Sequence, residues 1–292
     1  MSIDDAIAAA PYGRADRITP RVRRVLAKNP SAFTYLGTGT YIVGNDTVAV
    51  IDPGPDEDDH LAAILFATEG ETVSHILVTH THRDHSPLAV RLQQATGAQI
   101  AGCAELVLED DGPRSDAAFD ATYSPDRVLS DGESVSGPDW TLTAVHTPGH
   151  TSNHLCFALD EEQALFSGDH IMGWSTSVVS PPDGDMTAYL SSLKKLQQRE
   201  ETIYYPTHGD PVENPQKLVR GYLVHRRQRE TQILKLLADG PREIPGMVAA
   251  MYAMVSKALH PAAGRSVLAH LIDLERRNLV ERGEGAEWRL VA

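Results

Sequence analysis

The sequence is poor in cysteine and aromatic residues, and it has no long apolar run. Two cysteines stand among 292 residues, and aromatic residues make up 6% of the chain. Cys103 and Cys156 each lie in an apolar, strand-like stretch, so we expect free buried thiols rather than a disulfide or a thiolate metal site. No window reaches the ~18 apolar residues of a membrane span. The acidic opening residues 1–5 differ from the basic start of a signal peptide, so we expect a cytoplasmic protein.

Positive charge is also scarce, and it is unevenly distributed. The net charge is −14; residues 1–214 carry 13 Lys and Arg against 32 Asp and Glu, whereas residues 215–292 carry 13 against 8. An acidic body disfavours nucleic acid wrapped over the whole surface, but a basic tail can hold a polyanion locally or simply present solvated helix faces. The chain is also longer than a typical single domain, so we predict two domains, 1–214 and 215–292.

Candidate metal ligands are concentrated in one six-residue stretch, His-Thr-His-Arg-Asp-His at 80–85. It follows the apolar run 76–78 and precedes Ser86-Pro87, which are typical of the N-cap and first position of a helix. The ligands are therefore expected on a strand-to-helix turn.

The spacing within this stretch favours two metal ions rather than one. Residues i and i+2 of an extended chain share a face, so His80 and His82 can bind one ion, and the turn carries Asp84 and His85 towards a second. Nitrogen and oxygen ligands without thiolates favour zinc, with iron or manganese next.

Further apolar runs also end in residues able to bind a metal. The run 140–145 leads into a segment with three histidines, His146, His150 and His154, the run 164–168 ends in Asp169-His170, and the run 203–207 ends in His208. Asp52 closes the second strand of a hairpin expected at 40–51. A carboxylate at the end of a buried strand needs a partner, so we expect Asp52 to orient a ligand. Residues 109–126 are expected to form a loop.

These motifs, spread over about residues 20–214, resemble the ordered motifs of the metallo-β-lactamase superfamily. The match rests on His80-x-His82-x-Asp84-His85, Gly149-His150-Thr151, Ser167-Gly168-Asp169 and Thr207-His208-Gly209. The resemblance implies an α+β protein with a four-layer αβ/βα sandwich and two metal ions.

The resemblance also implies a role for each motif residue. His80, His82 and His150 would bind the first metal, Asp84, His85 and His208 the second, and Asp169 both. Asp84 and Asp169 would thereby hold the metal-bound hydroxide that acts as the nucleophile. Asp52, His146, His154 and His170 are expected to support these ligands. β-Lactamases of the superfamily lack the bridging Asp, so antibiotic hydrolysis is not the expected task.

The tail shows a different pattern, with helices expected at 216–237, 245–255 and 262–277 and a hairpin at 279–291. Three helices and a hairpin are typical of a small winged-helix domain. With its basic segment, the tail resembles the lactamase-beta-2-like subgroup, to which cleavage of single-stranded RNA is attributed. Arg226, Arg227 and Arg229 are the residues expected to bind a polyanion.

Three functions fit the sequence. The favoured one is a dinuclear zinc-dependent hydrolase that cleaves single-stranded RNA. The alternative is a thioester or lactone hydrolase of the glyoxalase II type, acting on a small molecule, in which the tail packs or forms a homodimer. A metal-stabilised nucleic-acid-binding regulator without turnover is disfavoured, because a structural zinc site closes with four ligands and seven are predicted here.

Overall fold

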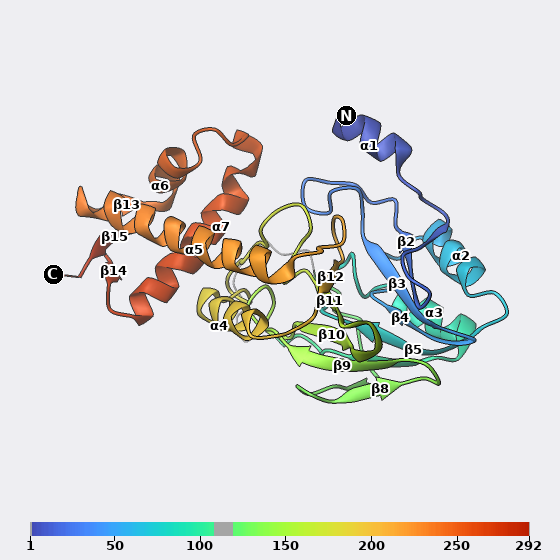
Figure 1. Cartoon of the computed structure of the whole chain (residues 1–292). Coiled ribbons are helices and arrows are strands. Elements are labelled where there is room, and N and C mark those ends of the chain that lie inside the picture. The colour runs from blue at the N-terminus through green and yellow to red at the C-terminus, as the bar shows by residue number, and fades with distance from the viewer. Residues whose placement is uncertain (1, 108–118, 292) are drawn as a thin grey trace. The chain divides into compact units, whose positions relative to one another are not determined.

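The structure, a computed structural model, describes residues 2–107 and 119–291 and divides into two compact units (Figure 1). Most of the loop expected at 109–126 lies outside the described residues. The first unit comprises Met1–Thr147, Asn153–Ser175 and Glu200–Pro215; the second comprises Pro148–Ser152, Thr176–Arg199 and Gln216–Ala292. Each unit has its own hydrophobic core.

A seven-stranded mixed sheet forms one half of the first unit. Its strands follow each other in chain order: β1 (Ala15–Arg17), β2 (Val22–Leu26), β3 (Gly39–Asn45), β4 (Thr47–Ile51), β5 (Thr72–Val78), β6 (Gln99–Gly102) and β7 (Arg127–Val128). Strands β1 to β4 are antiparallel, as a hairpin between β3 and β4 requires, and β4 to β7 are parallel. The parallel pairs are joined through α2 (Asp58–Ala67) and α3 (Ala89–Thr96), whose apolar sides pack on this sheet.

A five-stranded sheet packs against the first. Its order is β12 (Ile203–Pro206), β11 (Ala164–Gly168), β10 (Leu155–Leu159), β9 (Thr141–His146) and β8 (Ser134–Ser136), with the 3-10 helix η1 (Asp160–Glu162) between β10 and β11. Between the sheets, the Tyr41 ring lies 5.1 Å from Phe166 and 5.7 Å from Tyr205, measured between ring centroids. Buried residues of both sheets belong to one continuous core.

The strand directions explain where polar side chains gather. Strands β4 and β5 run parallel, and so do β11 and β12. The carboxyl ends of parallel strands meet at one edge of a sheet, so the residues that follow them become neighbours. Asp52 and Thr79 therefore come together in one sheet, and Asp169 and Thr207 in the other.

Two local predictions have different outcomes. Cys103 and Cys156 are buried thiols that form no disulfide among the described residues, as predicted. The prediction for Ser86-Pro87 was wrong, because α3 begins at Ala89 and its N-cap residue, Leu88, makes no side-chain cap. The Ser86 hydroxyl instead donates a hydrogen bond to Asp120 Oδ2 at 2.7 Å, a partner 34 residues away that local sequence does not reveal.

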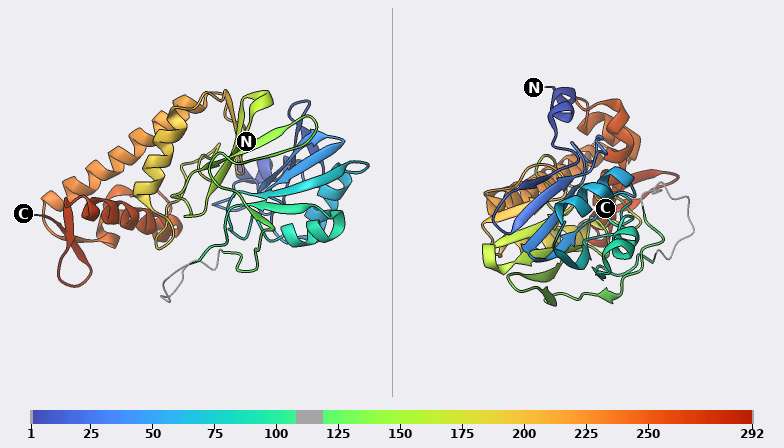
Figure 2. Two further views of the ribbon diagram at one scale, coloured as in Figure 1. Left: turned by 90° about the horizontal axis from the view of Figure 1, so that it is seen from below. Right: turned by 90° about the vertical axis from the view of Figure 1, so that its right-hand side faces the viewer.

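The second unit contains the predicted winged helix (Figures 1 and 2). Its elements are α4 (Met186–Gln197), α5 (Pro215–Ala238), β13 (Arg242–Glu243), α6 (Ile244–Met251), η2 (Lys257–Leu259), α7 (His260–Arg276), β14 (Val280–Arg282) and β15 (Glu287–Leu290). The three strands pair in the order β13-β15-β14. Ile233, Met247, Leu271 and Trp288 meet in its core, so the three helices and the hairpin predicted for the tail are confirmed.

The α+β class is confirmed as well. Outside these elements, the short helix α1 (Ile3–Ala9) begins with a capping box between Ser2 and Asp5. Of the helices in the described part of the chain, none combines the length and the apolar character needed to cross a membrane.

Candidate metal centre

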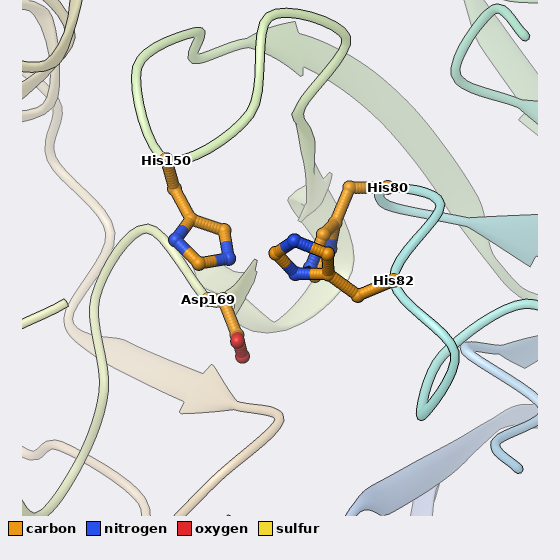
Figure 3. A group of neighbouring side chains, drawn as sticks. All are labelled: His80, His82, His150 and Asp169. Carbon is orange, nitrogen blue, oxygen red and sulfur yellow. The ribbon is translucent and has the colours of Figure 1, made fainter. Parts of the chain in front are cut away.

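One group of ligand atoms gathers where β5 and β11 end. His80, His82 and Asp169 each place one donor atom within 4.8 Å of the others, and their side chains point towards one another (Figure 3). Nε2 of His80 and Nδ1 of His82 are 2.9 Å apart. The i, i+2 spacing thus brings two imidazole nitrogens to one point, as expected from an extended chain.

The orientation of His80 follows from its hydrogen bonds. The hydroxyl of Thr79 donates to Asp52 Oδ2 at 2.8 Å and lies 3.0 Å from Nδ1 of His80. A hydroxyl has one proton to donate, so it accepts from Nδ1–H of His80. That tautomer leaves the lone pair on Nε2, the nitrogen that faces His82.

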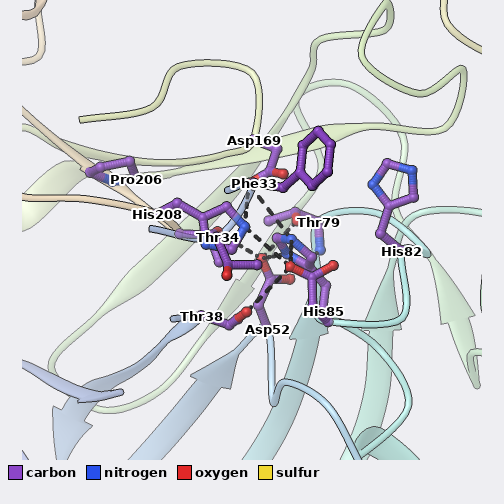
Figure 4. A network of polar contacts seen from close by, with 12 residues as sticks. Phe33, Thr34, Thr38, Asp52, Thr79, His82, His85, Asp169, Pro206 and His208 are labelled. Atoms are coloured by element: carbon purple, nitrogen blue, oxygen red, sulfur yellow. Dashed lines mark hydrogen bonds and ion pairs between the residues drawn. The ribbon is translucent and has the colours of Figure 1, made fainter. Parts of the chain in front are cut away.

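A second group lies beside the first and comprises Asp84, His85 and His208. Figure 4 labels His85 and His208 of this group. Asp84 Oδ2 lies 3.5 Å from Nε2 of His85 and 3.2 Å from Nε2 of His208. Oδ1 of Asp169 is 3.6 Å from the same nitrogen of His85 and 3.3 Å from that of His208. Asp169 therefore faces both groups.

Asp52 is the hydrogen-bond acceptor that joins these segments. Its Oδ1 accepts from the Thr79 backbone N–H at 2.8 Å, and its Oδ2 accepts from the hydroxyls of Thr79 and Thr207 and from Nδ1 of His85, at 2.8, 3.1 and 2.9 Å. Its φ of 48° lies in the left-handed region, which costs ~1 kcal/mol or more for a residue with a Cβ. The four bonds hold the side chain in place despite this cost.

The hydroxyl and carbonyl groups in this network were not foreseen from the sequence. Nδ1 of His208 donates to the Gly37 carbonyl at 3.1 Å, and the Thr38 hydroxyl donates to Asp84 Oδ2 at 3.3 Å. One local signal could have indicated two of the partners, because a threonine directly precedes the histidine in both motifs, Thr79 before His80 and Thr207 before His208.

Buried carboxylates shift the pKa values of the histidines in the second group. Burial by itself lowers the pKa of His85, but Asp84, Asp169 and Asp52 outweigh it and raise that pKa well above its ordinary value. At His208 burial likewise acts downward, and the carboxylates raise the pKa. Burial raises the pKa of Asp84, while the two histidines lower it to a net value below normal. The carboxylates thus require nearby positive charge.

The donor set fits divalent metal ions. Nε2 of His85 is fully buried and has no hydrogen-bond partner among the described residues. Two carboxylate oxygens, Asp84 Oδ2 and Asp169 Oδ1, lie 3.5 and 3.6 Å away from it. A buried polar atom without a partner is costly, and a cation between it and the carboxylates would remove that cost. Imidazole with carboxylate is the ligand chemistry of zinc, iron and manganese.

His150, the remaining predicted ligand, belongs to the loop Pro148–Ser152 of the second unit and is drawn in Figure 3. Its Nδ1 lies 2.7 Å from the Val178 carbonyl, which can only accept, so Nδ1 carries the proton and Nε2 has the lone pair. Gly149 has a φ of 134°, and a Cβ there would lie 2.3 Å from the backbone N of Tyr189. Gly149 before this histidine is therefore required by close packing.

The three other histidines differ in their surroundings. His154 is fully buried, and its Nε2 accepts a 3.2 Å hydrogen bond from the backbone N–H of Asp169. His170 is also buried, and its ring lies 5.8 Å from that of His154. His146 is exposed at the end of β9 and belongs to neither ligand group.

The arginines predicted to bind a polyanion do not share one environment. Arg226 is 4% exposed, donates to the Ser177 carbonyl and stacks over the Tyr189 ring at 5.1 Å. These contacts hold α5 against α4, and the role of Arg226 in binding a polyanion stays a prediction. Arg229 is half-buried over Tyr252, with 4.5 Å from its guanidinium carbon to the ring centroid. Arg227 is exposed.

An aromatic pair lies next to His208. The rings of Tyr35 and Trp174 stack with 5.2 Å between centroids, and Trp174 is 38% exposed. Both are anchored to the histidine through neighbours, since Gly37 O accepts from its ring and the Gly173 N–H donates to its carbonyl. The segments that carry the two rings are thus joined to His208 by hydrogen bonds of Gly37 and Gly173.

Two family models match the chain. The Metallo-beta-lactamase superfamily matches residues 35–208, and the Beta-lactamase associated winged helix domain matches residues 244–288. Among solved structures, a beta-lactamase domain protein from Burkholderia ambifaria aligns with a TM-score of 0.80 at 19% identity, covering 96% of this chain and 94% of that one. A metallo-beta-lactamase family protein from Thermus thermophilus aligns with a TM-score of 0.76 at 22% identity, covering 94% and 100%.

Sequence relatives include proteins with different names. The Beta-lactamase-like protein 2 homolog of Drosophila melanogaster is 31% identical over 283 residues, which cover 93% of each chain. The atrochrysone carboxyl ACP thioesterase of Cryptosporiopsis sp. is 33% identical over 235 residues, which cover 78% of this chain and 66% of that protein. With the ordered motifs, the fold and these matches in agreement, the chain belongs to the metallo-β-lactamase superfamily of metal-dependent hydrolases.

Proposed function

We propose that the protein is a dinuclear metal-dependent hydrolase that cleaves acyl thioesters. The observation that carries the dinuclear part is the position of Asp169, which belongs to the His80–His82 group and also lies 3.3 to 3.6 Å from the second-group nitrogens. One carboxylate facing two sets of imidazoles supports two neighbouring ions that share it.

The proposed ligand sets are those implied by the sequence motifs. His80, His82 and His150 would hold one ion, Asp84, His85 and His208 would hold the other, and Asp169 would serve both. For His150 the support is its tautomer, because Val178 occupies Nδ1 and leaves Nε2 to coordinate. Zinc is the proposed metal, since nitrogen and oxygen donors without sulfur suit it.

Two such ions, when bound, polarise a carbonyl and make water a competent nucleophile at neutral pH. The protein's residues orient this chemistry: Asp52 fixes the ring of His85, Thr79 fixes His80, and Gly37 fixes His208. A thiol has a pKa of about 8.5, so a thiolate leaves without prior protonation more readily than an alkoxide or an amine. A thioester can therefore be hydrolysed at a site that has metal ligands and the residues that orient them but no separate proton donor for the leaving group.

The substrate class also draws support from outside the centre. Several fungal relatives are named as ACP thioesterases, including one 34% identical over 234 residues. Because Arg226 is 4% exposed, an extended RNA strand can reach its guanidinium less readily than that of the exposed Arg227. The exposed ring of Trp174 beside His208 supplies apolar surface for an acyl chain.

Cleavage of single-stranded RNA is the second candidate. The stacked Tyr35–Trp174 pair favours it, because bases stack on aromatic rings without sequence preference. The exposed guanidinium of Arg227 could neutralise a phosphate.

A turnover screen of the metal-loaded full chain separates the candidates. Thiol release from acyl thioesters is measured beside cleavage of labelled single-stranded RNA, bis(p-nitrophenyl) phosphate, a lactone and a β-lactam. We expect thioester hydrolysis that is lost in Asp169→Asn and kept in His146→Gln, a matched control outside both ligand groups. RNA cleavage that requires Asp169, without thioester hydrolysis, would overturn the proposed substrate. Metal analysis in the same preparation tests zinc.

A further inference from the structure

The second unit contains a cation-lined cavity that the proposed hydrolysis does not use. It has a volume of about 410 Å³ and lies among α4, α5 and the end of α7. Four of its lining residues are cationic and one is acidic: Lys194, Arg226, Arg227, Arg277 and Glu230. The apolar residues Leu190 and Leu223 also line it.

The single acidic group of the cavity is already neutralised. Both terminal nitrogens of Arg277 donate to Glu230, at 2.9 and 2.8 Å, and one of them also donates to Asp273. Lys194 and Arg227, by contrast, have no carboxylate partner among the described residues, and both are exposed. The cavity therefore retains two unneutralised cations in a chain whose net charge is −14.

Arg226 lines the cavity with a guanidinium that is held in place and has one unused hydrogen-bond donor. Its guanidinium is held between the Ser177 carbonyl and the Tyr189 ring, and its Nε is buried without a hydrogen-bond partner in the described part of the chain. A buried guanidinium whose donors are not all used is costly unless an anion compensates it. This positive wall is built into the fold and does not depend on flexible surface side chains.

A second, shallow hollow of about 520 Å³ lies along one face of α5 and shares Arg227 and Thr231 with the first. Its other lining residues are neutral: Gln228 and Gln232 offer amides, and Val224, 49% exposed, offers an apolar contact. The two hollows together present a cationic end and a neutral end with hydrogen-bonding groups.

We propose that this pair of hollows binds a small organic phosphate, with the phosphate among Lys194, Arg226 and Arg227 and the neutral body along Val224, Gln228 and Gln232. Arginine donors match phosphate oxygens in geometry and charge. Such a phosphate has two sources. One is the phosphate-bearing arm of a coenzyme thioester, which rests on the proposed function; the other is a free nucleotide, which does not.

Calorimetric titration of the metal-loaded full chain tests the site. The probes are coenzyme A and AMP for the two sources, inorganic phosphate, and pantetheine as the phosphate-free control. We expect coenzyme A or AMP to bind at least tenfold more tightly than pantetheine, and the tighter of the two identifies the source. Equal binding of pantetheine and the phosphates would overturn the proposal.

Paired variants separate this site from any anion binding at the metal centre. Lys194→Gln/Arg227→Gln removes the two exposed, unpaired cations, so folding is expected to be unaffected. Lys217→Gln/Arg220→Gln makes the same charge change on exposed residues of α5 that line neither hollow. We expect about tenfold weaker binding of the organic phosphate in the first variant and less than a twofold change in the second. Equal weakening in both would mean general electrostatics and would overturn the site.

Two further readouts keep this inference distinct from the proposed hydrolysis. Turnover of an N-acetylcysteamine thioester, which lacks a phosphate, tests hydrolysis alone and is expected to be unchanged in both variants. Phosphate binding without any thioester turnover would support the cavity and refute the thioesterase. If the variants lose only binding of labelled single-stranded RNA, while no small phosphate binds, the cations serve RNA and the proposal fails.

Discussion

At the scale of single residues, Asp52 accepts four hydrogen bonds that hold the segments of the site together. We do not propose that it binds metal. Asp52→Asn keeps the size of the side chain, and Asn tolerates the left-handed φ of 48°. It removes the charge that pairs with His85 and turns an amide towards the Thr79 and Thr207 donors. We expect metal affinity or kcat/KM to fall by about 10- to 100-fold, measured by zinc titration and steady-state kinetics.

Thr207→Val is the graded control for this change, because it deletes one of the four hydrogen bonds and keeps the carboxylate. Its effect should be clearly smaller. If Asp52→Asn leaves both metal affinity and turnover unchanged, Asp52 is only a strand-end residue.

Asp169 and Asp84 should differ in what their loss does to metal content. Asp84 faces only the second group, so Asp84→Ala should retain about one ion per chain; Asp169 faces both groups, so Asp169→Ala should weaken both ions. Metal analysis after dialysis against a weak chelator measures this. Loss of the same number of ions in the two variants would argue against a shared carboxylate.

At the scale of secondary structure, neighbouring arginines on α5 should have opposite roles. Arg226 is buried against Ser177 and Tyr189, so Arg226→Gln should lower the free energy of unfolding by about 2–3 kcal/mol. Arg227 is exposed, and Arg227→Gln should change it by less than about 0.5 kcal/mol. Urea unfolding at fixed pH and salt compares them, and equal stabilities would contradict the burial argument.

Histidines on α5 and α7 should make stability depend on pH. Burial lowers the pKa of His270 to about 3 and that of His225 to about 4, with Arg226 and Arg229 acting in the same direction at both and Arg277 also at His270. Below about pH 6.5 the unfolded chain gains these protons and the folded chain does not. The stability that the two neutral histidines contribute is therefore fully present above that pH, and it declines as the pH falls towards 4.

His270→Leu isolates this effect, because both ring nitrogens of His270 lack hydrogen-bond partners among the described residues. Between pH 6.5 and 4.5 we expect the variant's unfolding free energy to decline less steeply, by up to about 1.4 kcal/mol per pH unit. Guanidinium unfolding at several pH values measures it. His60, whose pKa burial lowers to about 4, is present in both proteins and cancels. Parallel pH profiles would refute the assignment.

The sequence predicted elements well where apolar periodicity was local. The tail helices were found within a few residues because α5, α6 and α7 each bury a regular stripe. The sequence did not reveal contacts with distant partners: the Ser86 hydroxyl bonds Asp120, and Arg226 is buried against Ser177 and Tyr189. The candidate ligands were visible as sequence motifs. The role of Thr79 and Thr207 became clear only from the structure, in which the hydroxyls of both donate to Asp52.

At the scale of the whole molecule, the charge distribution limits binding to RNA. Residues 1–214 are strongly acidic, and Arg227 is the exposed member of the three arginines expected from the sequence to contact RNA together. We expect the logarithm of RNA affinity to fall with the logarithm of salt concentration with a slope no steeper than about −2. Fluorescence anisotropy from about 50 to 200 mM salt measures this. A slope of about −4 or steeper would restore the nuclease hypothesis.

The carboxylate of Asp52 also sets the order in which the centre can be assembled. It bonds to Thr79, which follows β5, and to Thr207, 155 positions further along the chain, so one carboxylate links the ends of strands from both sheets. During synthesis His80 and His85 emerge long before their counterpart His208, and closing so long a loop is entropically slow. If these residues bind metal as proposed, the second ligand group is complete only after β12 has joined its sheet, so full metal loading would follow the docking of this strand.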